Sequence, residues 1–211
     1  MDFKLPVVYP ILDSSFVPVV DRIGFLDRLG QSLADAGVWL MEYRNKSATD
    51  AEVLADARVL RAAMPWAALV LDDRADVALA AGLDGVHVDA GDLPPADARF
   101  LLGAERVVGT SASNEAQLLE ALAAPVDYIA FGPVFPTTTK QTSAAPIGID
   151  GVRRFRQVAG PEALLVAAAG IRLETAPAIL EAGASAVAVS SAIFSHADPA
   201  AEFRRWTARL G

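Results

Sequence analysis

Short apolar runs alternate with amphipathic segments along the whole chain, and this alternation limits the fold more than any other feature. Eight runs of strand length are separated by segments with apolar residues at helical spacing, such as 50–64 and 115–123. This order predicts a parallel sheet covered by helices. The runs are Val7–Asp13, Val38–Tyr43, Ala67–Leu71, Gly85–Val88, Arg106–Gly109, Tyr128–Phe131, Leu164–Ala168 and Ala186–Val189.

Eight strand–helix units in 211 residues predict one (β/α)8 barrel, a TIM barrel, as a single domain over residues 1–211. An open, doubly wound sheet is the alternative if the number of strands is wrong. Helix starts are expected at Thr49-Asp50 with Glu52, at Pro94-Pro95 and at Ser113-Asn114.

The composition excludes several classes of site and partner. The chain has no cysteine, and its two histidines, His87 and His196, lie far apart, so we expect neither disulfides nor zinc. A net charge of −8 does not support nucleic-acid binding. No signal-like leader or membrane-length apolar segment is visible, so we expect a soluble, cytoplasmic protein with small-molecule partners.

Polar residues follow each apolar run, where the mouth of a barrel would carry its chemistry. After the runs come Asp13-Ser14-Ser15, Arg44-Asn45-Lys46, Asp72-Asp73-Arg74, Asp89 with Asp92, Thr110-Ser111, the loop Gly132–Lys140, Gly170-Ile171 and Ser190-Ser191.

Basic residues in these loops predict an anion site. Lys46 and Lys140 are two of only three lysines in the chain, and Lys140 follows three threonines. Arg44 lies two positions before Lys46, so both side chains can point toward the same ligand. The alternative is that these are solvated loop charges.

The acidic residues predict a hard cation. Asp73 and Asp92 follow neighbouring strands and could hold Mg²⁺ against phosphate oxygens. The alternative is that Asp72 caps the helix over 75–81 and that Asp92 caps the helix at Pro94-Pro95.

A second anion site is predicted from Gly170 and Ser190-Ser191, with a short helix over 191–194, although a turn with a serine cap explains the same residues. His87 faces opposite to its valine neighbours, either toward the ligand or as a hydrogen-bonded core residue. No Gly-x-Ser-x-Gly element of a hydrolase is present.

With these motifs the chain resembles the thiamine phosphate synthase family nearly end to end. The motif after the sixth run is the most specific. The matching segments are Tyr9–Asp13, Tyr43–Lys46, Asp72–Asp76, Gly85–Asp92, Val108–Ser111, Asp127–Lys140, Ala169–Ile171 and Val189–Ile193.

The resemblance implies an enzyme that joins an aminopyrimidine methyl diphosphate to a thiazole phosphate and releases pyrophosphate by a dissociative displacement. It implies Mg²⁺ on Asp73 and Asp92, and thiazole phosphate on Gly170, Ser190 and Ser191. The diphosphate would be held by Arg44, Lys46, Thr137, Thr139 and Lys140, with Asp72 and Ser111 beside it. Of these, Arg44, Lys46, Ser111 and Lys140 are the expected catalytic residues.

Several positions depart from the family pattern, which has glutamine at Glu42, asparagine at Asp72, Gly-Gln at Asp89-Ala90 and glycine at Ala169. A thiazole tautomerase-like relative is an alternative, but that family has histidine where Pro133 stands. A phosphosugar epimerase or decarboxylase would not need Arg44, Lys46 and Lys140. A non-catalytic thiazole phosphate-binding protein, and self-association through the barrel exterior, stay open.

Overall fold

The computed structural model of the chain describes residues 3–89, 91–137 and 144–211. Eight parallel strands form a closed barrel in chain order, and β8 pairs back onto β1. The (β/α)8 prediction is confirmed, and this closure rules out the open sheet. That one domain spans residues 1–211 stays a prediction. The strands are β1 (Val8–Asp13), β2 (Leu40–Arg44), β3 (Ala68–Asp72), β4 (Gly85–Val88), β5 (Val107–Ala112), β6 (Tyr128–Phe131), β7 (Leu165–Ala168) and β8 (Ala186–Val189).

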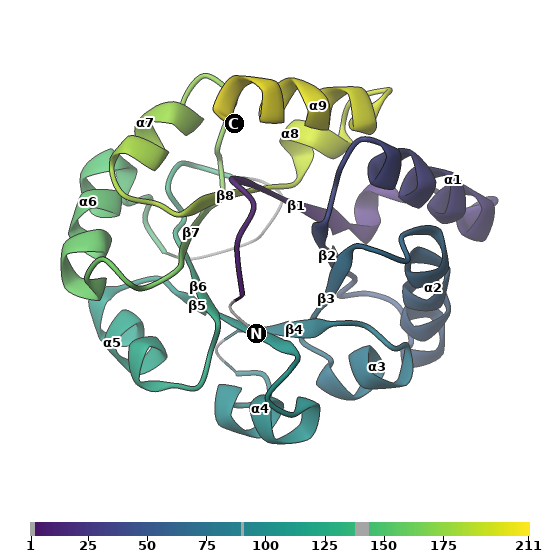
Figure 1. The fold of residues 1–211 in the computed structure, drawn as a ribbon, viewed down its shortest axis with the longest axis horizontal. Helices are drawn as coiled ribbons and strands as arrows, with labels where there is room; N and C mark the ends of the chain where they lie inside the picture. Colours follow the sequence, from purple (N-terminus) through teal and green to yellow (C-terminus); the bar gives the residue numbers. More distant parts are fainter. Residues whose placement is uncertain (1–2, 90, 138–143) are drawn as a thin grey trace.

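Helices surround the barrel on its outside (Figure 1). None of the helices in the described ranges is long and apolar enough to cross a membrane. They are η1 (Ser14–Phe16, a 3-10 turn), α1 (Arg22–Asp35), α2 (Asp50–Ala63), α3 (Ala75–Ala80), α4 (Pro95–Leu102), α5 (Glu115–Ala123), α6 (Gly148–Ala159), α7 (Ala176–Glu181), α8 (Ser191–Phe194) and α9 (Pro199–Leu210).

The predicted helix starts are confirmed, two of them by capping contacts. Thr49 and Glu52 form a reciprocal capping box at the start of α2. Asn114 accepts a hydrogen bond from the backbone N–H of Gln117 at 3.0 Å, and α4 begins at Pro95.

Two apolar layers hold the barrel together. The larger lies between strands and helices, and a smaller cluster fills the barrel interior with Tyr9, Val70, Tyr128 and Val166. Phe3 stacks on Tyr128 with ring centroids 6.1 Å apart, where the N-terminal segment crosses the barrel in Figure 1. The amino ends of the strands are therefore covered, and the opposite end carries the polar loops.

Several strand ends differ from the prediction by one or two residues, as in β2 and β3, and the end of the fifth strand differs most. Thr110 and Ser111 were expected after the fifth strand, but β5 continues to Ala112. Ser111 and Ala112 remain in register with Ala130 and Phe131 of β6, so the backbone ladder continues after the side chains become polar. Ser111 is consequently fixed by the sheet and not by a loop.

Candidate functional site

A cavity opens at the carboxyl ends of the strands and receives side chains from all eight of them. Its two sides differ in character, because β2 to β5 contribute ionisable and polar groups and β6 to β8 contribute mainly small apolar ones. The polar side contains Glu42, Arg44, Asp72, His87 and Ser111, and the apolar side contains Ala130, Val166, Ala168 and Ala188.

Arg44 lies between two carboxylates at the cavity wall. The sheet register places it directly beside Asp13 of β1, and its Nη1 makes an ion pair with Asp13 Oδ2. Its Nε lies 3.3 Å from Asp72 Oδ2 on the other side. Desolvation lowers the pKa of Arg44, but the charges of Asp72 and Asp13 outweigh it, so the pKa is raised and the side chain stays cationic.

Lys46 continues this network toward solvent. Its Nζ lies 3.0 Å from Asp72 Oδ2 and also contacts Asp73 Oδ2. Asp72 is buried, and desolvation raises its pKa although the charge of Lys46 opposes the shift. The structure therefore brings together four predicted residues, Arg44, Lys46, Asp72 and Asp73.

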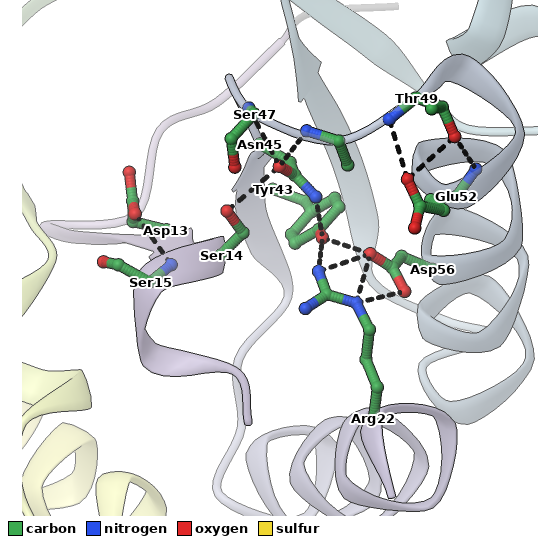
Figure 2. A network of polar contacts seen from close by, with 11 residues as sticks. Asp13, Ser14, Ser15, Arg22, Tyr43, Asn45, Ser47, Thr49, Glu52 and Asp56 are labelled. Carbon is green, nitrogen blue, oxygen red and sulfur yellow. Dashed lines mark hydrogen bonds and ion pairs between the residues drawn. The ribbon is translucent and has the colours of Figure 1, made fainter. Parts of the chain in front are cut away.

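Asn45 fixes the loop that carries both cations, as Figure 2 shows. Its Oδ1 accepts a hydrogen bond from the Ser14 hydroxyl at 3.1 Å and another from the backbone N–H of Ala48 at 3.2 Å. Its Nδ2 donates to the Tyr43 hydroxyl at 3.1 Å. Tyr43 and Asn45 tie the loop to the outer helices, whereas Arg44 lines the cavity and Lys46 lies beside it at Asp72.

The carboxylates beside Lys46 are suited to a hard cation. The pKa of Asp92 is raised, first by desolvation and then by the hydrogen bond and charge of Asp73. Asp73 Oδ1 is buried and has no hydrogen-bond partner among the described residues. Oxygen ligands with unmet electrostatic demand suit a hard cation such as Mg²⁺, and that Asp73 and Asp92 hold it stays a prediction.

The capping alternative for these aspartates is wrong. The residue before α3 is Arg74, and no side chain caps that helix. Asp92 accepts the backbone N–H of Asp89 at 2.9 Å, inside the loop, and Pro94 precedes α4 without a side-chain cap.

A buried chain of hydrogen bonds runs beneath the cavity. Tyr9 donates to Glu42 Oε2 at 3.2 Å, and the hydroxyls of Tyr9 and Tyr128 lie 2.9 Å apart. His87 Nδ1 lies 3.0 Å from the Tyr128 hydroxyl, and its Nε2 lies 2.8 Å from Ser111 Oγ. Both interpretations of His87 therefore hold, since it is hydrogen-bonded in the core and lines the cavity.

This chain of hydrogen bonds contains two functional candidates that sequence reasoning missed, namely Tyr9 and Tyr128. The available signal was polar residues at inward positions within apolar strands. Desolvation is the largest cause that raises the pKa of Glu42, to about 7, with the charges of Asp72 and Asp89 adding to it. The carboxyl group at the base of this cavity therefore titrates near neutral pH.

The predicted second anion site lies on the other side of the mouth. Gly170 has φ 69°, and a Cβ there would lie 2.6 Å from the Pro136 carbonyl oxygen, so only glycine fits. Ala169 also has a positive φ, 73°. Ser190 precedes α8, and its buried Oγ has no hydrogen-bond partner in the described part of the chain.

The remaining residues singled out in the sequence fall into two groups. Thr139, Lys140 and Ala90 lie outside the described residues. Thr137 and Ser191 line the main cavity.

Comparisons with known proteins agree with this geometry. Residues 8–193 match the family described as thiamine monophosphate synthase. A thiamine-phosphate synthase of Koribacter versatilis is 41% identical over 187 residues, covering 88% of each chain. One from Agrobacterium fabrum is 37% identical over 203 residues, covering 94% of this chain and 89% of its own. A solved thiamine phosphate pyrophosphorylase from Pyrococcus furiosus has TM-score 0.81 and 28% identity, covering 97% of this chain and 96% of that one.

Proposed function

Because the chain belongs to the thiamine monophosphate synthase family, we propose that it is a transferase of thiamine biosynthesis that joins an aminopyrimidine methyl diphosphate to a thiazole phosphate. The products are thiamine phosphate and pyrophosphate. The observation that carries the proposal is the convergence of Arg44 and Lys46 with Asp72 and Asp73 at the rim of the cavity.

The polar side of the cavity would hold the diphosphate. Arg44 and Lys46 would exchange carboxylate contacts for phosphate oxygens, and Ser111 and Thr137 would donate hydrogen bonds. Thr139 and Lys140 would complete the site. Asp73 and Asp92 would hold Mg²⁺, which supplies further positive charge to the diphosphate when it is bound.

The apolar side would hold the two heterocycles. Ala130, Ala168 and Ala188 leave space where larger side chains would fill the barrel. The thiazole phosphate would bind at Gly170, Ser190 and Ser191, which places its ring toward the same space.

The reaction needs charge stabilisation and orientation more than a general base. The bond between the methylene carbon and the diphosphate oxygen breaks with its electrons going to oxygen, and the resulting pyrimidine cation accepts the lone pair of the thiazole nitrogen. No proton moves in these two steps. Preorganised cations at the leaving group therefore provide the principal catalytic contribution.

Product formation tests the proposal directly. The purified protein is incubated with both substrates and Mg²⁺, and thiamine phosphate is oxidised to a fluorescent thiochrome. We expect Mg²⁺-dependent product, strongly reduced in Lys140→Ala and unchanged in Lys4→Ala, which alters an exposed lysine. Full turnover in Lys140→Ala would remove that residue from the site.

Absence of product would separate the alternatives. Stabilisation by thiazole phosphate without turnover would indicate a non-catalytic binding protein. Interconversion of thiazole phosphate tautomers would indicate the tautomerase-like activity, although Pro133 replaces the expected histidine. The cytoplasmic location and any self-association stay predictions.

A further inference from the structure

A chain of hydrogen bonds links Glu42, Tyr9, Tyr128, His87 and Ser111, and the displacement mechanism uses only Ser111 among them. Its members come from five different strands and meet inside the barrel. Each contact is 2.8 to 3.2 Å long, within hydrogen-bond range. Such a chain has only a few ways to place its protons.

Each tyrosine in the chain can donate only once. Desolvation raises the pKa of Tyr9 and of Tyr128 well above the usual value, so both phenols keep their single proton. When Glu42 is ionised it can only accept, so Tyr9 donates to it and Tyr128 must donate to Tyr9. Tyr128 then accepts from His87 Nδ1–H.

The direction of this chain determines the bond at its far end. A neutral His87 that carries its proton on Nδ1 has a lone pair on Nε2, and the hydroxyl of Ser111 donates to it. Ser111 then offers only lone pairs to the cavity. This arrangement opposes binding of a diphosphate, which requires donors.

One additional proton reverses the bond at Ser111. If Glu42 is protonated, it can donate to Tyr9, and the chain turns around until His87 Nε2–H donates to Ser111 Oγ. If His87 carries the proton, both of its nitrogens donate and the result at Ser111 is the same. In either case the hydroxyl proton of Ser111 is available to the cavity.

We propose that Glu42, acting through Tyr9, Tyr128 and His87, is a positioning residue that makes Ser111 a hydrogen-bond donor to the substrate diphosphate when the chain holds one additional proton. The inference rests on the proposed function for the identity of that anion. It gives Glu42 a role different from that of an uncharged side chain, which could not gain a proton.

The surroundings favour retention of this proton near neutral pH. Desolvation raises the pKa of Glu42 and lowers that of His87, but the charges of Glu42, Asp89 and Asp72 together outweigh the latter effect, so the pKa of His87 is raised. His87 Nε2 also lies 3.6 Å from Asp89 Oδ1. The ionisable groups around Glu42 are Tyr9, Arg44, Asp72, His87, Asp89 and Tyr128.

The first experiment measures the Mg²⁺-dependent affinity for pyrophosphate between pH 6 and 9. We expect the wild type to lose about tenfold in affinity toward pH 9, since a hydrogen bond to a charged group is lost. Glu42→Gln should remove most of this decline, because its amide does not titrate and can donate to Tyr9 at every pH. Ser111→Ala should also be flat, but at the lower affinity. Differences between variants cancel the titration of pyrophosphate itself.

Tyr9→Phe distinguishes the chain from a direct charge effect. This variant leaves Glu42 ionisable but breaks the hydrogen-bonded connection to Tyr128. We therefore expect most of the loss of pyrophosphate affinity toward pH 9 to disappear, as in Glu42→Gln. If Tyr9→Phe keeps the wild-type profile, the charge of Glu42 acts through space and the proposal is wrong. Glu115→Gln, an exposed carboxylate on α5, is the matched control and should keep the wild-type profile.

A second measurement does not depend on any ligand. The chain has only two histidines, so ¹⁵N-histidine NMR resolves His87 once His196→Gln assigns the other signal set. At high pH we expect the Nδ1–H tautomer in the wild type and the Nε2–H tautomer in Glu42→Gln. The same tautomer in both proteins would overturn the proposal even if no synthase activity were found, whereas missing product with the expected tautomers would count against the proposed function alone.

Discussion

The side chains of β2 and its following loop alternate between two networks of charged groups that differ in how their charges are paired. On the outward side, Asp56 is almost fully buried and receives Arg22 at 2.7 Å together with the Tyr43 hydroxyl (Figure 2). On the inward side, one oxygen of Asp72 serves both Arg44 and Lys46. The outward network satisfies its donors, whereas the inward network has two cations competing for one acceptor and can exchange contacts with a ligand.

Breaking the outward network should have the largest effect on stability. Asp56→Ala leaves Arg22 and Tyr43 without their acceptor, and removing one partner of a buried pair costs about 3 to 5 kcal/mol. Urea unfolding should show this loss. The exposed pair of Asp150 and Arg153 is the control, because Asp150→Ala should change the free energy of unfolding by less than about 1 kcal/mol. Equal losses in both variants would contradict the distinction.

Breaking the inward network should instead reduce turnover. Lys46→Met removes a cation from the leaving group, and loss of one preorganised contact lowers turnover by roughly 10²- to 10³-fold. The free energy of unfolding should change little, since Lys46 is partly exposed. Lys4→Met is the matched control. Steady-state kinetics beside urea unfolding measures both, and a mainly structural loss would remove Lys46 from the site.

The sequence was sufficient to predict that the basic side chains at the end of β2 share a direction. It was not sufficient to predict which residues meet inside the barrel. The two-residue spacing of Arg44 and Lys46 predicts that their side chains point the same way, toward one ligand. The contact between Tyr9 and Tyr128, 119 positions apart, depends on the stagger of the closed barrel, which strand patterns do not specify. The end of β5 was missed for a related reason, because backbone pairing continues under the polar Ser111.

The inward carboxyl group of Glu42 should make stability depend on pH. Its pKa is raised to about 7, so between its ordinary value and 7 the folded protein binds a proton that the unfolded chain does not. Stability from this group is complete at low pH and is lost as pH rises through 7. Urea unfolding at pH 5 and pH 8 should show a loss about 2 kcal/mol larger in the wild type than in Glu42→Gln. An equal loss in both proteins would show that Glu42 titrates normally.

The smallest expected effect concerns Asp72, where the two cations compete. Asp72→Asn removes the charge that neutralises Arg44 and Lys46, so both become freer to bind an anion. A gain of about 1 kcal/mol, roughly fivefold in pyrophosphate affinity, is expected at the effective dielectric of a partly buried site. Stability should change by no more than about 1 kcal/mol, because desolvation already raises the pKa of Asp72 and the neutral side chain escapes that cost.

Calorimetry with pyrophosphate and Mg²⁺ measures this change, and Asp76→Asn provides the control because Asp76 pairs with Arg74 in an exposed position. If the affinity rises only in Asp72→Asn, the carboxylate competes with the ligand for the two cations. If it falls, Asp72 contributes directly to the ligand or the cation. The inward network would then resemble the outward one, because removal of any one of its charges would weaken the contacts of the others.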